Sequence, residues 1–208
     1  MKAKSDAPAK FKEYVAKVEK QHPKSKMGRI RLDGGGEYAS QEKFLEYLAE
    51  EGIIREVSAT YSAQQNGISE RCYRTVLDPA WPMRNHPGMS NKLWAEAVST
   101  AVYIKNRLPF RALPNRTPFE RGTLKKPDIS HLRTFGCLAL SLIHGDLRKI
   151  LDNHTYKCVL VGYSETATQY RVMDISSGRV FIARDVKFDA STLYHQLLKT
   201  KVTRFAFE

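Results

Sequence analysis

The chain has 208 residues, of which 42% are hydrophobic, so it is long enough for one large or two small domains with apolar cores. Its 34 lysines and arginines outnumber its 22 acidic residues, and the formal charge is +12. A basic excess of this size favours a polyanionic partner such as DNA or RNA, although charge alone also fits a soluble protein that is merely basic. No apolar run has the length of a membrane span, and the lysine-rich start lacks the apolar segment of a secretory signal. We therefore expect no membrane partner and an intracellular protein, nuclear if it is functional.

The first part of the chain predicts alternating helices and strands. Residues 1–10 are mostly lysine, alanine and proline and predict a disordered tail. A helix is expected from Phe11 onward, followed by a short strand over 29–32, where apolar residues alternate with arginines. A second helix over 41–51 and a second strand over 53–59 come next. This order is typical of part of an α/β layer fold.

Two acidic turns stand out in this part. Asp33 comes directly after the first predicted strand and precedes three glycines. Glu70 follows the polar turn 64–67, whose Asn-Gly pair is a strong turn signal. Ser69 can cap the next helix, which puts Glu70 at its positive end, where a carboxylate and a bound metal are both well placed. Taken singly, Asp33 is more simply a turn former and Glu70 a solvated helix residue.

The helix that carries Glu70 is expected to end at about Asp78, because three prolines follow that remove helix donors, namely Pro79, Pro82 and Pro87. A clearer helix is predicted from Asn91 onward. Its apolar residues recur at helical spacing and should face the core. They are Trp94, Ala97, Val98, Ala101 and Val102.

The last part of the chain has a different texture. Residues 109–130 are rich in proline and basic residues and predict a connector lying over the surface. Short β-like runs follow, and their regular spacing predicts a small barrel, a module that more often binds than catalyses. The runs cover 137–143, 158–162, 170–173 and 179–183, with a hairpin turn at 176–178. Residues 191–208 predict a tail with at most one helical turn.

The cysteines indicate no disulfide framework. Cys72, Cys137 and Cys158 are odd in number and widely spaced, and they form no Cys-x-x-Cys zinc pair. We interpret them as buried free thiols. The six histidines do not complete a ligand pattern with them.

A set of motifs follows one order along the chain. These are 30–38, 52–53, 64–71, 93–97, 106–109, 117–120, 131–137, 161–164 and 184–189. Together they resemble the integrase region of copia-type retrotransposon Pol polyproteins, over about Phe11 to Asp189. The resemblance implies an α/β (α+β) fold class, with part of an RNase H-like integrase core over 11–108, the connector over 109–130 and an SH3-like β-barrel over 131–190. It leaves 191–208 as a divergent tail.

The resemblance also implies a chemistry. In that family three carboxylates hold Mg²⁺ or Mn²⁺, which activate a DNA 3′-hydroxyl for attack on a phosphodiester. On the motif match, Asp33 and Glu70 are catalytic and metal-binding residues. The residues implied in nucleic-acid binding are Gln64, Gln65, Asn66, Arg71 and Arg74. The implied partners are DNA and further integrase chains, either a homo-oligomer or other copies.

The family's first acid has no counterpart in the sequence. Only Asp6, Glu13 and Glu19 precede Asp33, and none lies in a segment that fits the role. The resemblance therefore implies an N-terminally truncated integrase fragment, inactive by itself. An alternative stays open, a non-catalytic nucleic-acid-binding or assembly module derived from a transposable element, as does a remnant with no cellular role.

Overall fold

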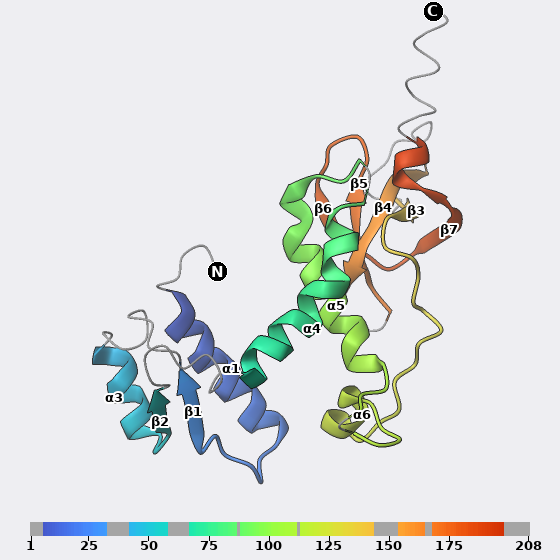
Figure 1. Cartoon of the computed structure of the whole chain (residues 1–208). Coiled ribbons are helices and arrows are strands. Elements are labelled where there is room, and N and C mark those ends of the chain that lie inside the picture. The colour runs from blue at the N-terminus through green and yellow to red at the C-terminus, as the bar shows by residue number, and fades with distance from the viewer. Residues whose placement is uncertain are drawn as a thin grey trace, which may run out of the picture. The chain divides into compact units, whose positions relative to one another are not determined.

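The computed structural model describes residues 6–32, 42–57, 67–86, 88–111, 113–143, 154–164 and 168–197. The chain divides into two compact units, Met1–Cys72 and Tyr73–Glu208, and the division falls within helix α4 (Gly67–Arg84). Both units are drawn in Figure 1. No helix in the described ranges is long and apolar enough to cross a membrane.

The first unit is built on a parallel pair of strands, β1 (Arg29–Leu32) and β2 (Ile54–Val57). Helix α3 (Glu42–Glu50) lies between them in the chain, so the order strand, helix, strand is confirmed. The core consists of Leu32, Phe44, Leu48 and Ile53. Helix α1 (Ala7–Gln21) joins this core through Phe11, whose ring packs edge-on against Phe44 at 5.6 Å between centroids.

The start of α1 differs from the prediction. The helix begins at Ala7, so residues 7–10, which we expected in a disordered tail, are helical. Pro8 is compatible with this start, because a proline in the first turn removes a donor that has no partner there. Pro8 and Val15 are both buried, which adds apolar contact that a sequence of lysines and alanines does not reveal.

The second unit contains an antiparallel five-stranded sheet in the order β6-β5-β4-β3-β7. The four predicted strands are present, and a fifth follows them along the chain. They are β3 (Cys137–Leu142), β4 (Thr155–Tyr163), β5 (Tyr170–Asp174), β6 (Val180–Ala183) and β7 (Val186–Leu193). The hairpin turn at 176–178 joins β5 to β6, with Gly178 at φ +70°, a conformation that glycine adopts without strain. Helices plus this sheet confirm the α+β class.

Two helices cover one face of this sheet. On β4, Val159 and Val161 pack against Ala97 and Ala101 of α5 (Trp94–Arg107), and Ala80 of α4 joins the same cluster. Cys158 and Leu160 alternate with these valines and belong to other clusters. Strand β4 is therefore buried on both faces from Cys158 to Tyr163, which explains its unbroken apolar run.

Helix α5 lies in the same compact unit as the five-stranded sheet. The resemblance assigns 94–107 to the integrase core, and that assignment stays a prediction. A single-turn 3₁₀ helix, η3 (Asn91–Leu93), leads into α5 and buries Leu93 in the shared cluster. The small alanines of α5 allow close approach to β4, so the helix and the sheet share one core.

Helix α4 continues past the predicted stop at Asp78 and ends at Arg84, with Pro79 and Pro82 inside it. Each proline removes one helix hydrogen bond and crowds the preceding turn, which costs about 3 kcal/mol in an isolated helix. Burial of Ala80 and packing of Met83 against the α5 cluster favour the helical path and offset part of this cost. The packing of Ala80 and Met83 thus outweighs the tendency of the prolines to end the helix.

The buried face of α5 also differs in part from the predicted stripe. Ala97 and Ala101 are buried and Val98 packs against the core, but Trp94 is 59% exposed and Val102 38% exposed. Thr100 is buried in their place and its hydroxyl donates a hydrogen bond to the Val161 carbonyl at 3.1 Å. A pattern based on apolar residues alone does not include this threonine.

The predicted connector is partly folded. Helix α6 (Pro118–Thr123) begins with Thr117, whose hydroxyl accepts a hydrogen bond from the Glu120 amide at 3.1 Å. The Arg107 guanidinium lies 3.4 Å from the ring centroid of Tyr103 and 4.6 Å from that of Phe119. These contacts join α6 to α5, so this part of 109–130 is packed rather than a free linker.

Candidate nucleic-acid interface on helix α4

The structure describes three of the seven predicted site residues. Glu70, Arg71 and Arg74 lie on α4, all exposed. Asp33 directly follows Leu32, the last residue of β1, but lies outside the described residues, as do Gln64, Gln65 and Asn66. The pairing of Asp33 with Glu70 therefore stays a prediction.

Glu70 lies in the first turn of α4, as expected. Ser69 is inside the helix, because the helix already includes Gly67, so its expected role as the cap is wrong. The Arg71 side chain turns back toward this end, and its Nε donates to the Gly67 carbonyl at 3.2 Å. The first turn thus presents a carboxylate and a guanidinium together, near the positive end of the helix dipole.

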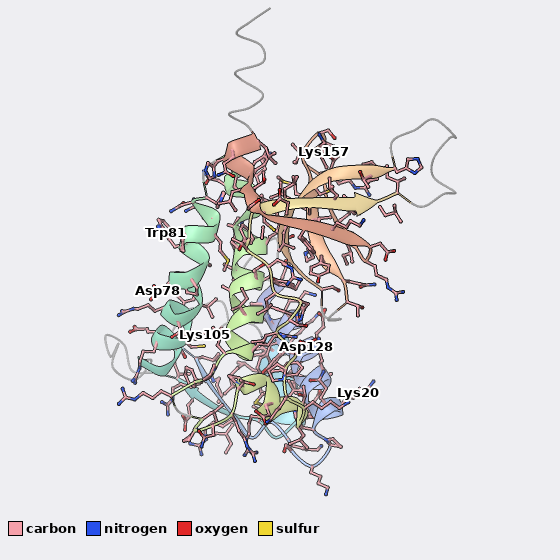
Figure 2. The ribbon with its side chains drawn as sticks, turned by 90° about the vertical axis from the view of Figure 1, so that its right-hand side faces the viewer. Lys20, Asp78, Trp81, Lys105, Asp128 and Lys157 are labelled. Carbon is pink, nitrogen blue, oxygen red and sulfur yellow. The ribbon has the colours of Figure 1, made fainter. Side chains whose placement is uncertain are left out.

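A basic and aromatic surface continues along the helix. Trp81 follows Arg74 by seven residues, so the two share one side of the helix. Trp81 is 62% exposed, and the Arg84 guanidinium lies 5.2 Å from its ring centroid, in cation–π contact. Figure 2 shows Trp81 on the side of α4 away from α5. We call Arg74, Trp81 and Arg84 the outer face of α4.

Sequence reasoning missed the later half of this surface. Tyr73, Trp81 and Arg84 are not among the predicted site residues, and Trp81 and Arg84 lie beyond the predicted helix end at Asp78. Tyr73 is 69% exposed. The signal that could have found them is the interleaving of aromatic residues with arginines over 71–84.

The metal site implied by the resemblance is not complete within the described ranges. Glu70 offers hard carboxylate oxygens, which suit Mg²⁺. Among the residues described, however, no group of three or more histidine, cysteine, aspartate or glutamate side chains could hold a metal ion. One exposed carboxylate by itself does not fit such a metal.

Comparison with known proteins agrees with the fold of the second unit. Residues 137–202 match the family described as the retroviral polymerase SH3-like domain. The match includes β3 to β7 and continues past residue 190, where we had placed the end of the barrel. Residues 194–197 are helical, which agrees with the single helical turn expected after β7.

Two relatives are similar to this chain over most of its length. It is 35% identical over 191 residues to the retrovirus-related Pol polyprotein from transposon TNT 1-94 of Nicotiana tabacum, and 30% identical over 189 residues to that from transposon RE2 of Arabidopsis thaliana. These alignments cover 92% and 91% of this chain but only 14% and 13% of the polyproteins. The similarity to the integrase region of copia-type retrotransposon Pol polyproteins is therefore confirmed.

One solved structure is also similar. It is a chain from the simian T-cell lymphotropic virus intasome in complex with PP2A regulatory subunit B56 gamma. The TM-score is 0.46 at 15% identity, with 90% of this chain and 65% of that chain covered.

Proposed function

We propose that this chain acts in DNA integration and that α4 contacts the DNA backbone without sequence preference. The observation that carries the proposal is the exposed arginines Arg71 and Arg74 beside the exposed carboxylate of Glu70 on one helix. Guanidinium groups bind phosphates and release condensed counterions, which drives affinity of this kind. The charge of +12 supports the same partner.

The aromatic residues of α4 add a second kind of contact. Tyr73 and Trp81 expose large ring surfaces between the arginines, and such rings stack on bases where a strand end is unpaired. The amides of Gln64, Gln65 and Asn66, which precede α4 in the sequence, add hydrogen-bond partners for phosphate and sugar. These contacts together bring the Glu70 carboxylate close to bound phosphates.

Asp33 and Glu70 would be two of the carboxylates of a metal site, at which Mg²⁺ or Mn²⁺ would supply Lewis acidity for polynucleotidyl transfer. Activity then requires a third carboxylate from elsewhere in a longer polypeptide or from another integrase chain. Cells that carry the functional protein should contain it in the nucleus, where its DNA partner is.

The match to an SH3-like domain favours a second candidate, a non-catalytic nucleic-acid-binding or assembly module. Small barrels of this kind more often bind than catalyse. If the chain is such a module, its basic and aromatic surfaces bind nucleic acid or other chains, and the carboxylate of Glu70 is dispensable.

The binding proposal is tested by fluorescence anisotropy with a labelled short duplex at several salt concentrations. The double variant Arg71→Gln, Arg74→Gln should reduce the slope of log K against log salt by about 1.8, because two phosphate contacts are lost. The matched control is Lys20→Gln with Lys24→Gln, which removes the same charge from exposed lysines at and just after the end of α1 and should leave the slope unchanged. An affinity that does not vary with salt, or an equal change in the control, would exclude α4 as the DNA surface.

The two candidates are separated by a metal-dependent nicking and strand-transfer assay on a labelled duplex. Loss of activity in both Glu70→Gln and Asp33→Asn, with activity retained in the control Glu46→Gln, supports the catalytic assignment. Salt-sensitive binding that is unchanged in Glu70→Gln, with no activity and no effect of Mg²⁺ or Mn²⁺, supports the binding module.

A further inference from the structure

A cavity opens on the sheet of the second unit, away from α4 and α5. Its volume is about 320 Å³, and it is lined by Tyr156, Asp174, Ser177, Arg179 and Phe181. These residues come from the start of β4, the end of β5, the following turn and β6, three strands that are neighbours in the sheet. The labels β4, β5 and β6 locate this part of the sheet in Figure 1.

Two aromatic rings form the apolar part of the cavity. Tyr156 and Phe181 have ring centroids 6.1 Å apart and planes inclined by 72°. Phe181 pairs with Val172 of the neighbouring strand. It also packs against the cluster of Ala139, Cys158 and Val172, and this contact holds its ring in place. Tyr156 is 44% exposed, so much of its surface is available to a ligand.

The acidic side chain of the cavity already has hydrogen-bond partners. Asp174 accepts four hydrogen bonds, from the amides of Ser176 and Ser177 at 3.0 and 3.2 Å and from their hydroxyls at 2.7 and 2.6 Å. These bonds use its carboxylate to hold the turn between β5 and β6. Asp174 therefore shapes the rim of the cavity rather than offering a free anionic site.

The cationic side chain of the cavity is Arg179, which is exposed. A planar guanidinium beside aromatic rings suits a ligand with a flat π-face and an adjacent phosphate. A cationic ligand would instead meet the positive charge of Arg179 in a chain that is already strongly basic. The volume lies at the small end of ligand cavities, so it fits one ring system rather than a larger molecule.

We propose that this cavity binds one unpaired nucleobase, which stacks on Tyr156 while Arg179 contacts the neighbouring phosphate. The proposal rests on the proposed function, since it takes nucleic acid as the partner, but it places a separate contact on the SH3-like unit. A base held in a duplex cannot enter, because it would have to leave its stack and its pair. The cavity therefore selects single-stranded or frayed nucleic acid.

The test compares the affinities of the full chain for labelled oligothymidylate and for a blunt duplex of equal length. Tyr156→Ala should weaken single-strand binding by about 5-fold to 150-fold, the range for loss of one stacked base, and change duplex binding by less than about 2-fold. Tyr156→Phe should keep single-strand affinity, because the ring remains. Arg179→Gln should weaken single-strand binding and reduce its salt slope by about 0.7.

Two matched controls lie on the adjacent strand positions, whose side chains point to the opposite face. Lys157→Gln removes one exposed charge next to Tyr156, and Ile182→Ala removes an exposed apolar side chain next to Phe181. Figure 2 labels Lys157. In both controls, stacking on Tyr156 should contribute as much to the affinity for oligothymidylate as it does in the parent chain. Equal losses in Tyr156→Ala and Ile182→Ala would overturn the assignment.

A titration with thymidine monophosphate, followed by NMR, separates this inference from the proposed function. Shifts at Tyr156 and Phe181 that disappear in Tyr156→Ala support the cavity even if α4 does not bind duplex DNA. The inference is overturned if oligonucleotide binding is strong and unchanged in Tyr156→Ala, and if thymidine monophosphate causes no NMR shifts. That result leaves the proposed function in place. Uptake of tetramethylammonium instead of the nucleotide would identify a cation site and also overturn it.

Discussion

Arg171 on β5 and Glu96 on α5 form a two-point ion pair, with Arg171 Nε 2.6 Å from Glu96 Oε2 and Nη2 2.5 Å from Oε1. The side chains are 33% and 17% exposed, so the pair is partly shielded from water. The hydrogen bonds to Glu96 raise the pKa of Arg171 above its ordinary value, although burial opposes this. Glu96 also lies in the first turn of α5, where a carboxylate is favoured. The pair joins the start of α5 to the sheet.

Replacement of Glu96 by glutamine should lower the unfolding free energy of the second unit by about 1 to 2 kcal/mol. The estimate lies below that for a fully buried pair, because water still screens part of the interaction. Urea unfolding followed by tryptophan fluorescence measures the effect in this unit, since it contains both tryptophans, Trp81 and Trp94.

The control for this prediction is Asp185→Asn, which removes one exposed carboxylate from the same unit. Its unfolding midpoint should stay close to that of the parent chain. If Glu96→Gln and Asp185→Asn had equal midpoints, the ion pair would contribute nothing specific to the contact between α5 and the sheet.

Gly162 should not tolerate a side chain. Strand β4 carries a bulge here, since Leu160 pairs with Val172 and Gly162 pairs with Arg171, so Val161 is the extra residue. The Thr100 hydroxyl reaches the Val161 carbonyl, and a Cβ on Gly162 would lie 2.9 Å from that hydroxyl oxygen. Gly162→Ala should therefore destabilise the second unit by about 1 to 3 kcal/mol in the same urea assay.

A double-mutant cycle identifies the cause. Thr100→Ala removes the hydroxyl and relieves the contact, so Gly162→Ala should cost less in that background than in the parent chain. Gly122→Ala serves as a matched control, because a Cβ at Gly122 meets nothing within 4 Å. Additive losses from Gly162→Ala and Thr100→Ala would show that the close approach to Thr100 is not what excludes a side chain.

The regular elements could be predicted from local pattern. Alternation of apolar residues with arginines located the strand at 29–32, because side chains of a strand alternate between two faces. A short β-like run over 137–143 located the strand at 137–142. The spacing of Ala97 and Ala101 likewise located the buried side of α5. The Asn-Gly turn at 64–67 placed Glu70 in the first turn of a helix, where the structure has it.

Contacts between residues far apart in the chain could not be predicted in this way. The bond from Thr100 to Val161 and the ion pair of Glu96 with Arg171 join residues separated by 61 and 75 positions. The continuation of α4 through Pro79 and Pro82 depends on the same kind of contact, since the core that favours it is formed by α5 and β4. For the candidate site, this continuation is what adds Trp81 and Arg84 to the exposed surface.

The contact between His131 and Tyr103 should make stability depend on pH. The His131 Nε2 atom lies 2.8 Å from the Tyr103 hydroxyl, and the pKa of His131 is lowered, first by burial and then by the nearby Arg107. A lowered pKa means that the unfolded chain binds this proton more readily than the folded chain does. The contribution of His131 to the unfolding free energy is therefore complete above the unfolded pKa of about 6.5. It is lost as the pH falls from that value toward the folded pKa.

We expect the unfolding free energy to decrease between about pH 7 and about pH 5, and to decrease less in His131→Gln. The comparison with His131→Gln isolates this group from the other histidines. The lowered pKa values of Asp174 and Asp189 act at lower pH, since both carboxyls titrate below their ordinary values. Identical pH profiles for His131→Gln and the parent chain would exclude the contribution.

The three cysteines should differ sharply in reactivity. We predicted that all were buried, which holds for Cys137 and Cys158 but is wrong for Cys72, which is exposed on α4. Burial raises the pKa of Cys137 to about 11 and that of Cys158 to about 12, so both remain thiols near neutral pH. Since the thiolate is the reactive form, a maleimide should modify only Cys72 in the folded chain.

Mass spectrometry of the labelled chain measures this directly. One label is expected under native conditions and three in denaturant, and Cys72→Ser should take up none while folded. The native rate for Cys72 should not change in Glu96→Gln, whereas labelling at Cys137 and Cys158 should increase as that variant opens more often. Rapid labelling of Cys158 in the folded parent chain would contradict the burial of its thiol among Ala139, Val172 and Ala183.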